Sequence, residues 1–478
     1  MLWAYGSYVG GRALVLVSTA ILARLLDPEA FGLVALALVF TALLESVADL
    51  GVGQALVVST GHPEEERGRA DTAFAISVAL GALLTLLVVA IAPLAALVFD
   101  EPELTGLLAA LGTNFLLRGL GSTHYALAQK RLDFRARTVA EMADVVVRGL
   151  AGIALALAGA GAWSLVLGYL IGTATLTLTL WILIPWRPRL RPQRQYVRGL
   201  VTFGGTLSAV SVIGALIGNV DYIFIGRVLG PTLLGLYTLG FRLPELIVVN
   251  LAIVAGQVLF PAFAAVDREA LGHAFLVSLR YTLMVAVPAA AVLVVLAEPL
   301  TLAAFGGQWR DSIAPMQVLT VYALAVAVGI PAGTAYKAVG RADVLLKLAV
   351  PRGILVIASI AVFVDRGITA VAACQAAVAA LFGAIGIWLA ARLLAVGWRR
   401  IWATAWPVLA AVVPMLAGML AVDAALTSPW PTLLAGAAVG SAAYLAVLWT
   451  LDRDSLLRLR DMALARSEPT PPGTPAVP

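Results

Sequence analysis

The sequence is poor in charged and in redox-active side chains. Asp, Glu, Lys and Arg make up 12% of its 478 residues, and it holds one cysteine and three histidines; soluble domains are about a quarter charged. The single Cys374 excludes a disulfide within the chain and a metal site built from cysteines. The histidines, His62, His124 and His273, have no spacing typical of a metal site or an activated nucleophile, and no Walker phosphate-binding loop occurs. We therefore expect no cofactor, no metal site and no enzymatic activity.

Apolar residues dominate instead. They make up 61% of the sequence, and the mean hydropathy is +0.97. Runs of about twenty apolar residues recur along the chain, and each can cross a hydrocarbon core of roughly 30 Å as a helix. The pattern predicts an all-α, polytopic membrane protein with about fourteen transmembrane helices, near residues 2–23, 31–54, 72–93, 104–126, 139–159, 162–185, 200–222, 233–256, 279–298, 312–334, 345–363, 368–391, 403–423 and 431–450.

One short motif occurs twice. ARLLDPEAFGLVAL (residues 23–36) is matched by GRVLGPTLLGLYTL (residues 226–239), which places Arg24 on Arg227, Pro28 on Pro231 and Gly32 on Gly235. In each copy the proline can start the second helix of a hairpin, and the glycine permits close approach of helices. Six predicted spans separate the copies, so both copies face the same side of the membrane. The repeat predicts two parallel six-helix lobes, 1–195 and 196–395, two additional helices in 396–455, and a tail at 456–478 with a disordered, Pro-rich end.

Basic residues collect in alternate connections, which predicts the orientation of the chain. The basic loops include 186–199, WRPRLRPQRQYVRG, which joins the two predicted lobes, while the other set of loops holds only Arg24, Arg227, Arg310 and Arg366. Lys and Arg accumulate on the cytoplasmic side of membrane proteins. We therefore expect both termini in the cytoplasm.

Several charged residues fall inside the predicted spans. A charge at the bilayer centre costs about 2.5–3.5 kcal/mol, so such residues usually face a bundle interior or a watery cavity. The basic ones are Arg12, Arg118, Arg148, Arg242 and Arg352, and the acidic ones are Glu45, Asp49, Glu141, Asp144, Asp221 and Glu245.

Two interpretations of these charges stay open. Asp144 lies four residues before Arg148, and Arg242 lies three residues before Glu245, so each pair can neutralise itself on one helix face. Alternatively the five arginines line a cleft and bind an anion, most simply a phosphate or diphosphate, with the acidic residues as ion-pair or proton-coupling partners. The charges do not follow the repeat, which suggests an asymmetric substrate.

The motifs resemble a known family. ARLLDPEAFGLVAL with ADLGVGQALV (residues 48–57), ALAQKRLDFR (126–135), DYIFIGRVLGPTLLGLYTL (221–239) and FPAF (260–263) resemble the polysaccharide transporter family of Wzx-type oligosaccharide flippases, in the superfamily that also holds multidrug extruders and the peptidoglycan lipid flippase. The resemblance covers about residues 1–460. It implies alternating access and movement of an undecaprenyl-diphosphate-linked oligosaccharide across the bacterial inner membrane, for O-antigen, capsule or exopolysaccharide export.

The same resemblance implies partners and leaves two rivals. The expected partners are the lipid-linked oligosaccharide, membrane lipids and a polysaccharide polymerase with its export machinery, with no nucleic acid. A cation-coupled multidrug exporter of the same superfamily would favour an acidic cavity, and the intramembrane arginines speak against it. A membrane-embedded polymerase or ligase would need a long outward loop, and every predicted outward loop is short.

Overall fold

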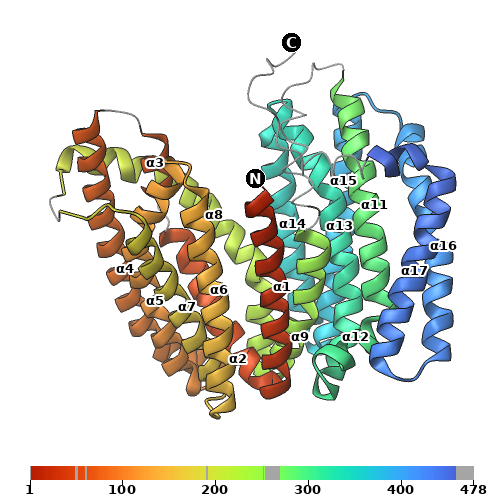
Figure 1. The fold of residues 1–478 in the computed structure, drawn as a ribbon, viewed down its shortest axis with the longest axis horizontal. Helices are drawn as coiled ribbons and strands as arrows, with labels where there is room; N and C mark the ends of the chain where they lie inside the picture. The colour runs from red at the N-terminus through yellow and green to blue at the C-terminus, as the bar shows by residue number, and fades with distance from the viewer. Residues whose placement is uncertain are drawn as a thin grey trace. The chain divides into compact units, whose positions relative to one another are not determined.

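The computed structural model describes residues 2–48, 52–59, 62–189, 192–250, 252 and 270–458, and within these ranges the regular structure is entirely helical. Figure 1 shows the chain as a series of helices joined by short connections. In order, they are α1 (Leu2–Leu25), α2 (Pro28–Ala48), α3 (Val52–Val58), α4 (Pro63–Phe99), α5 (Glu103–Lys130), α6 (Phe134–Leu157), α7 (Ala162–Leu183), α8 (Arg194–Val228), α9 (Pro231–Pro244), η1 (Glu245–Val249), α11 (Leu271–Val295), α12 (Ala297–Ala304), η2 (Gly307–Ser312), α13 (Ile313–Ala338), α14 (Ala342–Phe363), η3 (Val364–Arg366), α15 (Ile368–Leu393), α16 (Trp398–Ala425) and α17 (Pro429–Leu451).

The chain is a multi-pass membrane protein, as its composition predicts. Among the described residues, eleven helical stretches are long and apolar enough to cross a membrane. A helix also occurs at each of the fourteen predicted spans, and the three outside this set of eleven are α1, α6 and α8. The all-α class is thus confirmed, while the count of fourteen stays a prediction.

Two predicted spans differ from the helices found. The span at 31–54 covers α2, which ends at Ala48, and part of a separate short helix, α3. The span at 233–256 begins as α9 but changes to a π-helical turn, η1, directly after Pro244. Proline has no amide proton to donate within the helix, and its ring clashes with the carbonyl group of the preceding turn. These two effects account for the change to a π-helical turn.

Some sequence predictions concern residues outside the described ranges. These are Asp49, the FPAF segment at 260–263 and the Pro-rich end of the chain.

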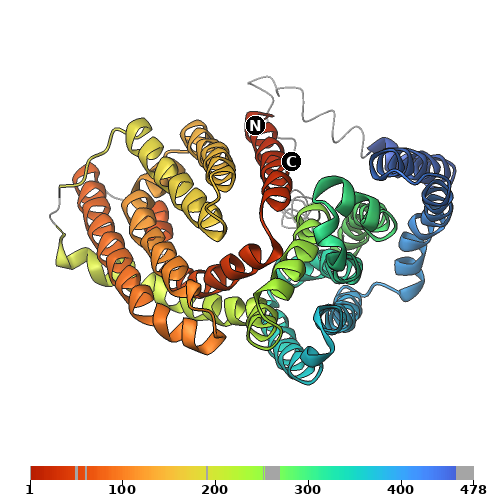
Figure 2. The same cartoon turned by 90° about the horizontal axis from the view of Figure 1, so that it is seen from below.

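The helices pack into two compact units. The first, called the N-unit, comprises Trp3–Leu239 and Val356–Val371; the second, the C-unit, comprises Gly240–Leu355 and the chain from Ala372 onward. These units follow from packing and not from the repeat, and the predicted lobe limits at 195 and 395 stay a prediction. Within the C-unit, α16 and α17 lie side by side (Figure 2). The hydroxyl of Tyr444 on α17 donates a 3.0 Å hydrogen bond to the carbonyl of Met284 on α11, which joins this pair to the rest of the unit.

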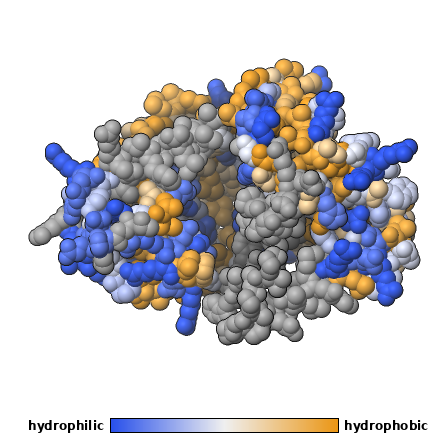
Figure 3. Space-filling model, turned by 90° about the horizontal axis from the view of Figure 1, so that it is seen from above, coloured by the Kyte–Doolittle hydropathy of each residue, from blue (hydrophilic) through white to orange (hydrophobic). Residues whose placement is uncertain are grey.

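Within the N-unit, the connection after α7 is tied to α4. The Asp71 carboxylate accepts a hydrogen bond from the amide of Arg189, and the Thr72 hydroxyl accepts one from the amide of Gln193. Figure 3 looks onto the end of the molecule where these segments lie, and hydrophilic side chains gather there. His124 is fully buried beneath this connection, where its ring stacks on Trp181, so it serves as a packing residue.

The two copies of the repeated motif touch each other inside the N-unit. A Cβ atom placed on Gly32 of α2 would lie 1.7 Å from the carbonyl oxygen of Pro231, and one on Gly235 of α9 would lie 1.8 Å from the carbonyl oxygen of Pro28. The contact is reciprocal, as in an interface formed about a two-fold axis. A third glycine, Gly226 of α8, lies against Leu36 of α2. The glycines therefore let the backbones of the two hairpins come into direct contact.

Asp221 lies on α8, five residues before Gly226, and contributes to packing. It is 1% exposed, and one carboxylate oxygen accepts a 2.7 Å hydrogen bond from the hydroxyl of Tyr237. A buried carboxylate that loses a donor is destabilised. This burial indicates a structural role for Asp221, and its role as a coupling or ion-pair partner stays a prediction.

The Tyr237→Phe substitution tests this role. We expect it to lower the stability of the protein by about 1–3 kcal/mol, because it removes a donor from a buried charged acceptor. The measurement is thermal unfolding of the purified protein in detergent. Tyr281→Phe is the matched control, since no hydrogen bond of its hydroxyl is found in the described part of the chain. Equal unfolding temperatures for the two variants would contradict the structural role.

Candidate functional site

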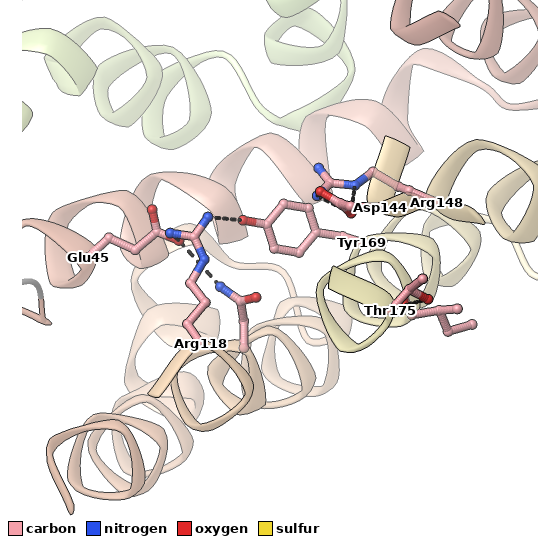
Figure 4. A network of polar contacts seen from close by, with 8 residues as sticks. Glu45, Arg118, Asp144, Arg148, Tyr169 and Thr175 are labelled. Atoms are coloured by element: carbon pink, nitrogen blue, oxygen red, sulfur yellow. Dashed lines mark hydrogen bonds and ion pairs between the residues drawn. The ribbon is translucent and has the colours of Figure 1, made fainter. Parts of the chain in front are cut away.

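Figure 4 shows a network of polar side chains within the N-unit. We call it the central network, and it comprises Glu45 of α2, Asn114 and Arg118 of α5, Asp144 and Arg148 of α6, and Tyr169 of α7. Its members come from four helices that are otherwise largely apolar. The two arginines and two carboxylates balance one another in formal charge.

Arg148 is the most firmly held of the arginines. Its Nη2 donates to both oxygens of Asp144, at 2.8 and 2.7 Å, and its Nε donates to the same carboxylate at 3.2 Å. The guanidinium lies over the ring of Tyr169, 4.4 Å from the centroid, in a cation–π arrangement. Gly172 leaves room for the pair, because a Cβ at that position would lie 2.3 Å from Asp144 Oδ1.

Arg118 is held more loosely. Its Nη1 lies 3.4 Å from Glu45 Oε1, and its Nη2 lies 3.5 Å from the hydroxyl of Tyr169. The same Glu45 oxygen accepts a 3.3 Å hydrogen bond from Asn114 Nδ2. Tyr169 thus joins the two halves of the network, since its hydroxyl meets Arg118 while its ring lies under Arg148.

The arginines of the network are open on one side. The Arg118 side chain is 53% exposed although it lies near the middle of α5, and the Arg148 side chain is 37% exposed. An arginine at mid-membrane depth is stable beside water or a polar partner and costly against lipid chains. Exposure of these side chains therefore favours a place beside water over a place against lipid chains.

The predicted pairing of Asp144 with Arg148 is thus found. The pairing of Arg242 with Glu245, in the C-unit, is looser at 3.8 Å, with both side chains more than 40% exposed. Glu45 pairs with Arg118 on another helix, which helical spacing alone does not predict. The interpretation as ion pairs therefore holds for Asp144 with Arg148, and the interpretation that the five arginines line a cleft and bind an anion stays a prediction.

The remaining predicted site residues lie elsewhere. Arg12 on α1 is exposed, and Arg352 on α14 is half-buried. No ion pair to Arg352 is found among the described residues. Asp221 is buried beside Tyr237. That Arg12, Arg242 and Arg352 line the same cavity as the central network stays a prediction.

Sequence reasoning missed Asn114 and Tyr169. Asn114 precedes Arg118 by four residues and so shares its helix face, a signal that could have been used. It is completely buried, and its carbonyl oxygen has no hydrogen-bond partner among the described residues. Tyr169 gives no such signal, because a tyrosine in a transmembrane helix is most often a packing or interfacial residue.

Known proteins resemble this chain in sequence and in fold. The family model described as "Polysaccharide biosynthesis protein" matches residues 21–314. This chain belongs to that family. The match includes both copies of the repeated motif and the whole central network.

Curated relatives extend the similarity over nearly the full chain. The succinoglycan biosynthesis transport protein ExoT of Rhizobium meliloti (strain 1021) is 30% identical over 97% of this chain and 95% of its own length. The lipopolysaccharide biosynthesis protein WzxC of Escherichia coli (strain K12) is 30% identical over 73% of this chain and 71% of its own length. Both relatives are named for polysaccharide biosynthesis, and ExoT is named as a transport protein.

Solved structures show the same fold at low sequence identity. The lipid II flippase MurJ in an inward closed conformation aligns with a TM-score of 0.78 over 95% of this chain and all of that chain, at 15% identity. An inward-facing multidrug resistance MATE transporter of the MOP superfamily aligns with a TM-score of 0.65 over 80% of this chain and 94% of its own, at 17% identity. At these identities the likeness concerns the fold alone.

Proposed function

We propose that this protein is a flippase that carries undecaprenyl-diphosphate-linked oligosaccharide units across the bacterial inner membrane by alternating access. It serves the export of O-antigen, capsule or exopolysaccharide. Membership of the polysaccharide biosynthesis family and the names of ExoT and WzxC support this role. Both termini lie in the cytoplasm in this proposal, because the basic residues collect in the loops on that side.

The exposed, mid-helix guanidinium of Arg118 is the observation that carries the proposal. With Arg148 nearby in the same network, it offers two planar cations to one anion. A guanidinium binds phosphate through two parallel hydrogen bonds. The diphosphate of the substrate can therefore bind here while its lipid chain stays in the bilayer.

The carboxylates can couple binding of the substrate to uptake of protons. When a diphosphate competes for Arg118 and Arg148, Glu45 and Asp144 lose their partners and become costly to keep ionised. Uptake of protons by these two acids would restore the balance of charge, so binding of the anion and of protons would reinforce each other. In this role the carboxylates are coupling partners and not passive ion pairs.

Complementation of a bacterial strain that lacks its own polysaccharide flippase tests the function. We expect this protein to restore surface polysaccharide and to leave the drug resistance of a strain without efflux pumps unchanged. The readouts are labelled surface polysaccharide and minimal inhibitory concentrations of cationic drugs. Drug resistance without restored polysaccharide would instead favour the multidrug exporter.

Reconstituted vesicles separate transport from synthesis. We expect purified protein to move a fluorescent undecaprenyl-diphosphate oligosaccharide between leaflets without changing its mass. An increase in the length of the saccharide would indicate a polymerase or ligase and contradict the proposal.

A further inference from the structure

A second polar cluster lies on the same helices as the central network, nearer to one end of the N-unit. The hydroxyl of Tyr125 on α5 donates to Glu141 Oε1 at 2.8 Å and accepts from Arg137 Nη2 at 2.7 Å. Arg137 also lies 3.4 Å from Glu141 Oε1, and its guanidinium lies over the Tyr125 ring, 4.7 Å from the centroid. Arg137 lies in the first turn of α6, just before the predicted span at 139–159.

This cluster repeats the design of the central network. In both, an arginine of α6 pairs with a carboxylate four residues away and covers a tyrosine ring from a neighbouring helix. Steps of four, three and four residues separate Arg137, Glu141, Asp144 and Arg148, so all four lie along one face of α6. Arg137 and Arg148 are eleven residues apart, which is roughly 16 Å along the helix axis.

The second cluster has unused binding capacity. Arg137 Nε is buried and has no hydrogen-bond acceptor among the described residues, and an unmet donor on a charged group is costly. Glu141 is 48% exposed, so the cluster is open to water on the side of the carboxylate. A ligand that displaces Glu141 would take over the Nη2 donor that Glu141 now accepts from.

We infer that Tyr125, Arg137 and Glu141 form an entry subsite, which binds the diphosphate of the lipid-linked saccharide before the central network receives it. This inference rests on the proposed function. The diphosphate replaces Glu141 at Arg137 and then moves along the polar face of α6 to Arg148 and Arg118. Arginines placed in a row let the diphosphate move from one cation to the next. It then does not have to return to bulk water between the two sites.

The position of the cluster supports an entry role. It lies close to the basic connection between α5 and α6, where Lys130 Nζ binds Glu66 and the carbonyl of Ser59, both at 2.7 Å. The loops at this end are predicted to be cytoplasmic, and a substrate that is to be moved outward arrives from that side. An anionic phospholipid headgroup shares the phosphate chemistry, so the test must distinguish these two ligands.

The experiment compares Arg137→Gln with Arg135→Gln in the full-length protein. Arg135 lies two residues away on the same helix and is exposed, so its substitution removes the same charge without touching the subsite. Both variants are reconstituted in vesicles of neutral lipid, with and without phosphatidylglycerol. Transport of a fluorescent undecaprenyl-diphosphate oligosaccharide is then measured against its concentration.

We expect Arg137→Gln to raise the half-saturating concentration about 10-fold, the effect of one lost charge-assisted hydrogen bond, and to leave the maximal rate within about twofold. Arg135→Gln should match the wild type. The unfolding temperature of Arg137→Gln shows whether this variant has a folding defect. Arg137→Lys keeps the positive charge and should recover part of the affinity for the substrate.

Two outcomes would overturn the entry subsite. One is identical saturation curves for Arg137→Gln and Arg135→Gln while the wild type transports the substrate. The other is an effect of Arg137→Gln that occurs only when phosphatidylglycerol is present, which would assign the cluster to phospholipid. Failure of the wild type to transport the substrate at all would contradict the proposed function instead.

Discussion

Gly32→Ala is expected to prevent formation of the N-unit as described and to abolish transport. The new methyl group would lie 1.7 Å from the carbonyl oxygen of Pro231, where only backbone atoms could move aside. Overpacking against flexible side chains costs about 1–3 kcal/mol, so a clash with a backbone should reach or exceed the upper value. The measurements are the yield of monodisperse protein, its unfolding temperature and its complementation of the flippase-deficient strain.

Gly214→Ala is the control for this experiment. It changes a glycine on α8, where an added Cβ meets no atom within 4 Å, and alanine favours a helix by up to about 1 kcal/mol over glycine. We therefore expect this variant to be as stable as the wild type or slightly more so. Gly235→Ala should reproduce Gly32→Ala, and the double variant should add little, because both changes disrupt one contact. Wild-type stability of Gly32→Ala would contradict the crossing of the two hairpins.

Arg148→Lys is expected to reduce transport by about 10- to 100-fold while the protein stays folded. Lysine keeps the positive charge near Asp144 but lacks the planar fork and the stacking surface over Tyr169. Loss of charge-assisted hydrogen bonds to an anion accounts for about 1.5–3 kcal/mol, which corresponds to that range of rates. The measurement is the initial rate of transport in vesicles, together with the unfolding temperature.

Two further variants separate binding from stability. Arg148→Ala should be less stable, because it leaves the carboxylate of Asp144, which is 14% exposed, without its partner. Arg148→Ala combined with Asp144→Ala should regain stability and still fail to transport. Arg366→Lys is the matched control, since Arg366 covers the ring of Phe363 at 4.8 Å outside the central network. Wild-type transport by Arg148→Lys would contradict the need for a planar guanidinium at this position. Wild-type transport by the variant that combines Arg148→Ala with Asp144→Ala would remove the electrostatic basis of the mechanism.

Helical spacing predicts the ion pair within one helix of the site but not the contacts between its helices. Asp144 and Arg148 are four residues apart on one helix, so their pairing needs no knowledge of the fold. The partner of Arg118 is Glu45, which lies on a different helix and 73 positions earlier in the chain. Tyr169 links the two pairs from a fourth helix. Such contacts depend on how α2, α5, α6 and α7 are packed, which local periodicity does not contain.

The sequence by itself determined the membrane-spanning class, the helices and the duplication, because apolar runs must span a bilayer and a repeated motif must build a repeated hairpin. Tertiary structure alone decided that the two hairpins meet backbone to backbone at Gly32 and Gly235. It also decided which carboxylate each arginine holds. The physical reason is that hydropathy is a property of each helix by itself. Backbone contacts and ion pairs depend instead on the register between helices that are far apart in the chain.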